Sequence, residues 1–120
     1  MATHNELGKT GEQIAVDYLK NKNYRIRERN WRYRKAEIDI IAEQNTTLVV
    51  VEVKTRSSIY FGNPQDFISK KQINSLVLAT DAYLSLKKLQ LEVRFDIISI
   101  VVNHNKVTNI QHIENGFLHF

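Results

Sequence analysis

The alternation of hydrophobic and polar residues predicts seven elements of secondary structure along this chain. Two segments, about 6–22 and 69–88, place their apolar residues at helical spacing. Alternating or continuous apolar runs predict five strands, at 24–30, 37–42, 48–54, 93–102 and 106–113. The order helix, three strands, helix, two strands predicts an α/β fold, in which two main helices flank a central mixed sheet of about five strands.

Short polar segments separate these elements. Glu43-Gln44-Asn45-Thr46 is typical of a turn, so the strands on either side of it are predicted to form a hairpin. Asn103-His104-Asn105 predicts a second turn, and Gly62-Asn63-Pro64 is the strongest break in the sequence. We see no linker, repeat or low-complexity stretch, so we interpret residues 1–120 as one domain.

Two of the predicted strands carry charged residues where hydrophobic ones would be expected. Glu52 and Lys54 interrupt a run of valines, and they share one face because side chains alternate along a strand. Asp39 lies between two isoleucines of the preceding strand, although aspartate is disfavoured in strands. Asp39 and Glu52 are about equally distant from the turn at 43–47. A hairpin would therefore bring two carboxylates and a lysine together.

Such a cluster favours a hard divalent cation. Two close carboxylates repel each other unless a proton or a cation lies between them. Carboxylate oxygens without cysteine or histidine select Mg²⁺ or Mn²⁺; the chain has no cysteine, and its four histidines share no ligand spacing. The ion can polarise a phosphodiester, and Lys54 can stabilise the developing charge. The alternative is a surface Glu52–Lys54 ion pair with Asp39 at the end of a strand.

The distribution of basic residues indicates an anionic partner more clearly than the net charge of +4. Between residues 20 and 35 there are eight basic residues and one acid, interleaved with Tyr24, Trp31 and Tyr33. Arginines bind phosphate and aromatic rings stack on bases, so this segment is a candidate nucleic-acid surface. The alternative is a solvated edge strand, whose charges prevent aggregation. The candidate contacts in this segment are Arg29, Arg32, Arg34 and Lys35.

Other residues outside the acidic cluster have two interpretations each. Lys71 and Gln72 start the second predicted helix, where they either reach a phosphate or are simply solvated. Arg56 either contacts a nucleic-acid backbone or pairs with Asp66. For Trp31 the alternatives are base stacking and a lid over the core. Asp96 shares its face of the strand with Arg94 and Ile98, so a structural ion pair is favoured over a role as a metal ligand.

A series of ordered motifs resembles the bacterial YraN family over about residues 8–100. That family is related in fold to Holliday-junction resolvases and restriction endonucleases, the PD-(D/E)xK nucleases, and is largely uncharacterised in function. The motifs are Gly11-Glu12-Gln13-Ile14-Ala15, Tyr18-Leu19, Arg29-Asn30-Trp31-Arg32, Glu37-Ile38-Asp39-Ile40-Ile41-Ala42, Val50-Val51-Glu52-Val53-Lys54-Thr55-Arg56 and Arg94-Phe95-Asp96.

The resemblance implies a restriction-endonuclease-like core and assigns roles to the acidic cluster. It implies metal ligands at Asp39 and Glu52, with the Val53 carbonyl as a third, and makes Lys54 the catalytic lysine. It also implies that Glu12 helps to hold the metal or its water, whereas the residues alone suggest a solvent-facing acid favoured by the helix dipole. The chain departs from the family in having Ala36 where glycine is usual. It also lacks a related exonuclease pattern, because Leu76 and not tyrosine follows Gln72 by four residues.

These observations lead us to expect an endonuclease that uses Mg²⁺ or Mn²⁺ to hydrolyse DNA, at branched or repair intermediates. The alternatives are a nucleic-acid-binding module that acts with a partner without cutting, and a structural protein without a nucleic-acid role. Work on a two-fold junction would need a homodimer, which no feature of the chain establishes. The start of the chain does not resemble a secretory signal, and no apolar run could cross a bilayer, so we expect a cytoplasmic protein without membrane attachment.

Overall fold

The computed structural model describes the backbone of residues 4–57 and 68–116, and the side chains of these ranges from residue 10 onwards. The elements follow the predicted order, and the predicted α/β class is confirmed. Their bounds are α1 His4–Asn21, β1 Arg25–Tyr33, β2 Ala36–Gln44, β3 Thr47–Arg56, α2 Lys70–Lys87, β4 Glu92–Asn103 and β5 Lys106–Ile113. The predicted break at 62–64 lies outside the described residues.

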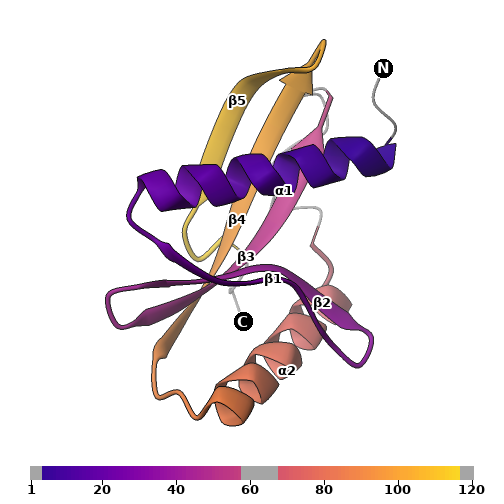
Figure 1. The fold of residues 1–120 in the computed structure, drawn as a ribbon. Coiled ribbons are helices and arrows are strands. Elements are labelled where there is room, and N and C mark those ends of the chain that lie inside the picture. The colour runs from indigo at the N-terminus through magenta and orange to yellow at the C-terminus, as the bar shows by residue number, and fades with distance from the viewer. Residues whose placement is uncertain (1–3, 58–67, 117–120) are drawn as a thin grey trace.

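The five strands form one mixed sheet in the order β1-β2-β3-β4-β5. β3 and β4 run parallel, and the three other neighbouring pairs are antiparallel. The crossover between β3 and β4 contains α2, as a parallel pair requires a long connection. Figure 1 shows α1 lying across one face of the sheet, and β1 and β2 turned away from the direction of β4 and β5. The sheet is therefore strongly twisted.

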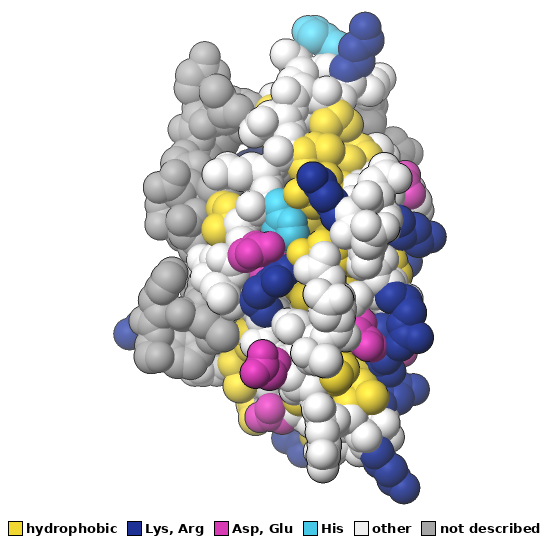
Figure 2. Space-filling model, turned by 90° about the vertical axis from the view of Figure 1, so that its left-hand side faces the viewer, with side chains coloured by type: hydrophobic (Ala, Val, Ile, Leu, Met, Phe, Trp, Pro, Cys, Tyr) yellow, Lys and Arg dark blue, Asp and Glu magenta, His cyan; other side chains and the backbone are white. Residues whose placement is uncertain are grey.

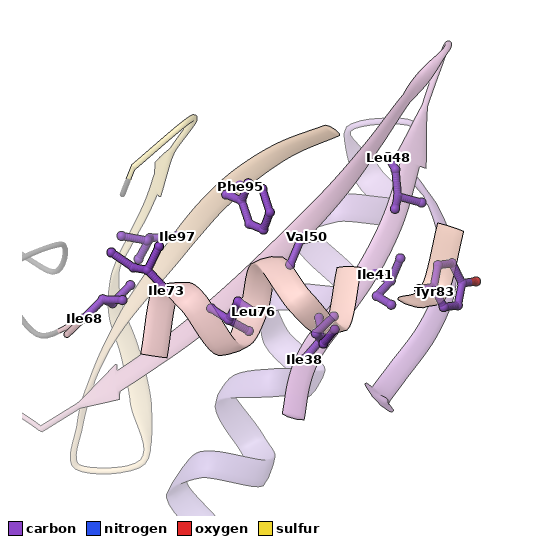
Figure 3. Close-up of a cluster of buried hydrophobic side chains, with 11 residues drawn as sticks. Ile38, Ile41, Leu48, Val50, Ile68, Ile73, Leu76, Tyr83, Phe95 and Ile97 are labelled. Carbon is purple, nitrogen blue, oxygen red and sulfur yellow. The ribbon is translucent and has the colours of Figure 1, made fainter. Parts of the chain in front are cut away.

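Each helix covers its own hydrophobic cluster on the sheet. Figure 3 shows the cluster beneath α2, where Leu76 and Tyr83 of the helix meet Val50 and Phe95 of the central strands. The cluster beneath α1 joins helix residues to residues of the strands: Ala15, Val16, Leu19, Tyr24, Ile40, Ala42, Val49, Val51, Ile98, Ile100 and Val102. Burying one such aliphatic side chain contributes about 1.5–3 kcal/mol, so the two clusters account for the attachment of both helices.

The ends of α2 follow from its sequence. Ser69 precedes the helix, and its hydroxyl oxygen accepts a hydrogen bond of 3.1 Å from the Gln72 backbone N–H, which caps the first turn. Lys88 takes the left-handed conformation with φ 52° and ends the helix. The predicted apolar face is confirmed, because Ile73 and Leu76 are among the buried residues.

The hairpin of β2 and β3 has the register that the sequence predicts. Ile40 pairs with Val51, and the strands are connected through Asn45, which has a φ of 55°. This is the last registered pair, although β2 begins four residues before Ile40 and β3 continues to Arg56. The two strands therefore separate next to Asp39 and Glu52.

The prediction for β1 is wrong in one respect. The alternation suggests that Tyr24, Ile26 and Glu28 share one face of the strand. In the structure, a register shift between Ile26 and Glu28 inserts Arg27 as an extra residue. Tyr24 and Ile26 pack under α1, whereas Glu28 accepts a hydrogen bond of 3.0 Å from the Tyr83 hydroxyl on the α2 side. The strand also continues further than predicted, to Tyr33.

A buried ionic cluster connects β4 to β5 and to the turn that follows β5. Asp96 is 0% exposed and accepts hydrogen bonds from Arg94, at 2.9 Å to Nε and 2.8 Å to Nη2, so the predicted ion pair is confirmed. His112 Nε2 lies 2.7 Å from Asp96 Oδ2, and the Asn115 backbone N–H donates to Asp96 Oδ1 at 3.1 Å. On the face drawn in Figure 2, acidic, basic and histidine side chains lie close together among hydrophobic ones.

Candidate functional site

Asp39 and Glu52 lie where β2 and β3 separate, and each carboxylate is held by a protein donor. Val53 N–H donates to Asp39 Oδ2 at 2.8 Å, and Gln72 Nε2 donates to Glu52 Oε1 at 3.0 Å. Lys54 Nζ lies 3.6 Å from the same Glu52 oxygen. Within the described part of the chain, no hydrogen bond reaches the second oxygen of either carboxylate. Both groups are therefore oriented by the protein and keep one oxygen available.

Glu12 of α1 and Glu37 of β2 lie beside Asp39. One carboxylate oxygen from each of these three residues lies within 4.8 Å of the others. Gly11 lets α1 approach β3, because a methyl group on Gly11 would overlap the side chain of Thr55. The sequence analysis missed Glu37, although its position two residues before Asp39 on one strand places the two side chains on the same face.

The electrostatics of the site oppose the accumulation of negative charge. Burial, reinforced by the neighbouring Glu52 carboxylate, raises the pKa of Asp39 to about 8, although the hydrogen bond from Val53 N–H acts in the opposite direction. Burial also raises the pKa of Glu52, against the lowering effects of Lys54 and Gln72. A cation placed between these carboxylates would remove the cost of ionising them.

A cavity of about 450 Å³ opens beside the two carboxylates. Asp39 and Glu52 form its acidic wall, and the first turn of α2 forms the opposite side. Lys35 and Lys71, two of the residues predicted to bind nucleic acid, line the same cavity. Gln72, predicted for the same role, also lines it, but its side chain donates to Glu52. The sequence alone did not indicate this contact.

The remaining basic residues of the predicted surface have protein partners or lie elsewhere. Arg29 Nη1 donates to Gln13 Oε1 at 2.9 Å, and Arg32 pairs with Glu37 at 2.8 Å. The Arg34 guanidinium lies 5.3 Å from the centre of the Tyr33 ring. Arg56 is the last residue of β3, and its predicted partner at position 66 lies outside the described residues. Figure 2 shows lysine and arginine side chains gathered mainly along one edge of the face it draws.

Trp31 has the contacts of a core lid. Its ring stacks parallel to Tyr33 at 6.3 Å and meets Tyr83 edge-on at 5.1 Å. It packs against the cluster beneath α2 and is only partly buried. These contacts are sufficient to explain why the edge strand β1 carries a tryptophan, and no stacked base is required.

Fold and site together define an α/β protein in which a cavity at the edge of a mixed sheet is acidic on one wall and basic at its rim. Residues 11–100 match the uncharacterised protein family UPF0102, and the chain belongs to this family. UPF0102 proteins of Christiangramia forsetii and Flavobacterium psychrophilum are 55% and 52% identical to the chain, over 100% of each partner. One from Persephonella marina is 48% identical over 92% of this chain and 91% of its own length. The matched range agrees with the motifs at 8–100.

The structure also bears on membrane attachment. Among the described helices, none has the length and apolar character needed to cross a membrane.

Proposed function

We propose that this protein is a metal-dependent endonuclease that hydrolyses phosphodiester bonds of DNA. The observation that carries the proposal is the pair of carboxylates formed by half-buried Asp39 and buried Glu52, each held through one oxygen beside Lys54. Carboxylates in such a setting are costly unless a cation or a proton compensates them. Their position at a cavity with lysines on its rim supports an anionic substrate.

The donor set fits Mg²⁺ or Mn²⁺. Glu12, Glu37 and Asp39 offer clustered carboxylate oxygens, and Glu52 offers a fourth carboxylate at the same cavity wall, so the site consists of hard oxygen ligands. The Val53 carbonyl remains a ligand that the family resemblance implies. When bound, the ion would supply Lewis-acid polarisation of the phosphodiester and a more acidic water.

The chain's own residues provide positioning and charge. Lys71 on α2 and Lys35 in the turn between β1 and β2 line the cavity and attract a backbone phosphate. Lys54, held near Glu52, offers a positive charge where negative charge develops during cleavage. Gln72 and Val53 N–H fix the two carboxylates before the substrate arrives, which reduces the cost of organising the site.

The biological setting is part of the same proposal. Branched or repair intermediates of cytoplasmic DNA are the proposed substrates, and two copies would act together where both strands of a junction are cut. The second candidate is a module that binds nucleic acid without cutting and acts with a partner. The observation that favours it is the exposure of Arg34 and Lys35 between β1 and β2, where they can contact phosphates whether or not the strand is cut.

The first experiment compares the wild type with an Asp39→Ala/Glu52→Ala variant on junction, flap and single-stranded DNA in Mg²⁺. We expect metal-dependent cleavage by the wild type and a loss on the order of 10³-fold in the variant, because several kcal/mol of transition-state stabilisation are removed. Asp81→Ala/Glu92→Ala, which removes two exposed acids, is the matched control and should cut normally. Equal cutting by all three proteins would refute the proposal. Salt-sensitive binding without cutting would support the second candidate.

Gln72→Ala tests the positioning of Glu52. Loss of a hydrogen bond to a metal-binding carboxylate typically costs 10- to 100-fold in affinity, so we expect Mn²⁺ binding to weaken about tenfold. Isothermal titration calorimetry measures this directly, with Gln90→Ala, an exposed residue beyond α2, as the control. An unchanged Mn²⁺ affinity in Gln72→Ala would show that the contact with Glu52 does not support the site.

A further inference from the structure

A second cavity lies at the opposite end of α2, apart from the acidic site. Its volume is about 290 Å³, and three of its lining residues are cationic. The lining consists of Arg25, Ile26, Arg27, Glu28, Tyr83 and Lys87. The register shift in β1 gives this cavity its shape, because the extra residue Arg27 is directed toward Tyr83. Arg25 and Arg27 belong to the basic segment at 20–35, but neither they nor Lys87 are among the individual nucleic-acid contacts predicted from the sequence.

Arg27 is a pre-oriented group. Its Nε donates to the Tyr83 hydroxyl at 3.0 Å, and its Nη1 pairs with Glu43 at 2.7 Å. Its guanidinium also lies 5.8 Å from the centre of the Tyr83 ring, and the side chain is only 17% exposed. A guanidinium held in this way loses little conformational entropy when it binds a phosphate oxygen.

The charge balance of the cavity favours an anion. Glu43 is shared between Arg27 and Arg25, which lies 2.9 Å away, so one carboxylate faces two guanidinium groups. Glu28 already accepts the hydrogen bond of the Tyr83 hydroxyl. Together with Lys87, three cations stand against two acids, and the surplus positive charge lies at the cavity mouth with the exposed Arg25 and Lys87.

The two cavities open along the same side of α2. Gln72 and Leu76 line the acidic cavity, and Tyr83 and Lys87 line the second one. These positions are spaced by four, seven and four residues, which is one stripe of a helix. Gln72 and Tyr83 are eleven residues apart, or about 16 Å at 1.5 Å per residue. A strand of duplex DNA rises 3.4 Å per step and also winds around the axis, so two of its phosphates this far apart are separated by roughly three nucleotide steps.

We propose that this second cavity binds a backbone phosphate of the DNA substrate about three nucleotide steps from the bond held at the acidic site. The inference rests on the proposed function for the identity of the anion. The second cavity adds a fixed contact to the proposed site. The DNA strand follows the boundary between β1 and α2, from the lysines at residues 35 and 71 to the guanidinium groups of Arg25 and Arg27. A contact at this distance requires that the DNA strand extend for at least this length on that side of the cut.

The test uses the DNA substrate that the wild type cuts, with the arm on one side of the cut shortened from eight to three base pairs. We expect the wild type to bind the short arm several-fold more weakly, because the short arm has no phosphate that reaches the second cavity. Lys87→Ala and Arg25→Ala/Lys87→Ala should bind the long arm several-fold more weakly and weaken little more on shortening. Their salt slope should fall by about one for each phosphate that is no longer bound. Lys106→Ala, which removes an exposed lysine of β5, is the matched control and should retain the wild-type response to arm length.

The possible outcomes separate this inference from the proposed function. A wild type that neither binds nor cuts any DNA refutes the proposed function and this inference with it. A wild type that cuts, with Arg25→Ala/Lys87→Ala behaving like Lys106→Ala, refutes the second phosphate contact alone. If the double variant binds more weakly than the wild type by the same factor on both arm lengths, the spacing of about three steps is overturned. Melting temperatures of all variants confirm that the fold is retained.

Discussion

Replacement of Asp96 with alanine is expected to destabilise the protein by about 3–5 kcal/mol. The side chain is fully buried, and it accepts hydrogen bonds from Nε and Nη2 of Arg94 and from Asn115 N–H, with His112 at 2.7 Å. Its removal leaves the guanidinium of Arg94, only 18% exposed, without its main counter-charge. Breaking one partner of a buried pair costs more than the pair contributes, because the other charge stays buried.

Urea unfolding of the wild type, Asp96→Ala and Glu114→Ala measures this effect. Glu114 is the matched control, since it pairs with the same Arg94 at 3.6 Å but is 61% exposed. Exposed pairs contribute about 0–1 kcal/mol, so the control should unfold almost like the wild type. A similar small loss in both variants would show that the cluster around Asp96 does not hold β4 and β5 together.

The contribution of Asp96 should also depend on pH. Burial opposes its ionisation, but the hydrogen bonds from His112, Arg94 and Asn115 outweigh this effect and lower the pKa below the ordinary value of 3.8. A lowered pKa of an acid stabilises the folded state at pH values above the unfolded pKa, and this stability is lost as the pH falls through the folded pKa. The difference in unfolding free energy between the wild type and Asp96→Asn should therefore reach its largest value above about pH 4 and decrease below it.

Much of the fold and part of the site could be predicted because local patterns decide them. The turn at Asn45 and the apolar runs on either side fix the hairpin register, and this register brings Asp39 and Glu52 to the point where the strands separate. The spacing of Ile73, Leu76 and Tyr83 fixes the face of α2 that covers the sheet. These features depend on residues close in the sequence, so period and turn chemistry are sufficient.

Features that depend on contacts between distant segments could not be predicted. The bulge at Arg27 arises where β1 meets Tyr83 of α2, and no local sequence pattern predicts it. Gln72 is a plausible phosphate ligand in the sequence, and only the packing of α2 on the sheet brings its amide to Glu52. Glu37 is a different case. Its spacing of two residues from Asp39 could be seen in the sequence, but only the approach of Glu12 shows that Glu37 belongs to the acidic cluster.

Gly11 connects the fold to the acidic site, and Gly11→Ala is expected to destabilise the protein by about 3 kcal/mol. In an open helix this change would stabilise by about 1 kcal/mol, because alanine has the higher helix propensity. Here the added methyl group would overlap the side chain of Thr55, three atoms of which would lie within 3.1 Å of it. The helix must then move away from β3, which costs packing and displaces the neighbouring Glu12 from Asp39.

A double-mutant cycle separates this steric effect from any other consequence of Gly11→Ala. Thr55→Ala removes the atoms that the new methyl group would meet most closely, so Gly11→Ala should become neutral or stabilising in that background. Thermal or urea unfolding measures the cycle, and Mn²⁺ titration of the same four proteins should show affinity falling in Gly11→Ala and recovering with Thr55→Ala. If Gly11→Ala were equally harmful with and without Thr55, close approach of α1 to β3 would not be the reason for glycine. Recovered stability without recovered Mn²⁺ affinity would show instead that Glu12 does not depend on this approach for its place beside Asp39.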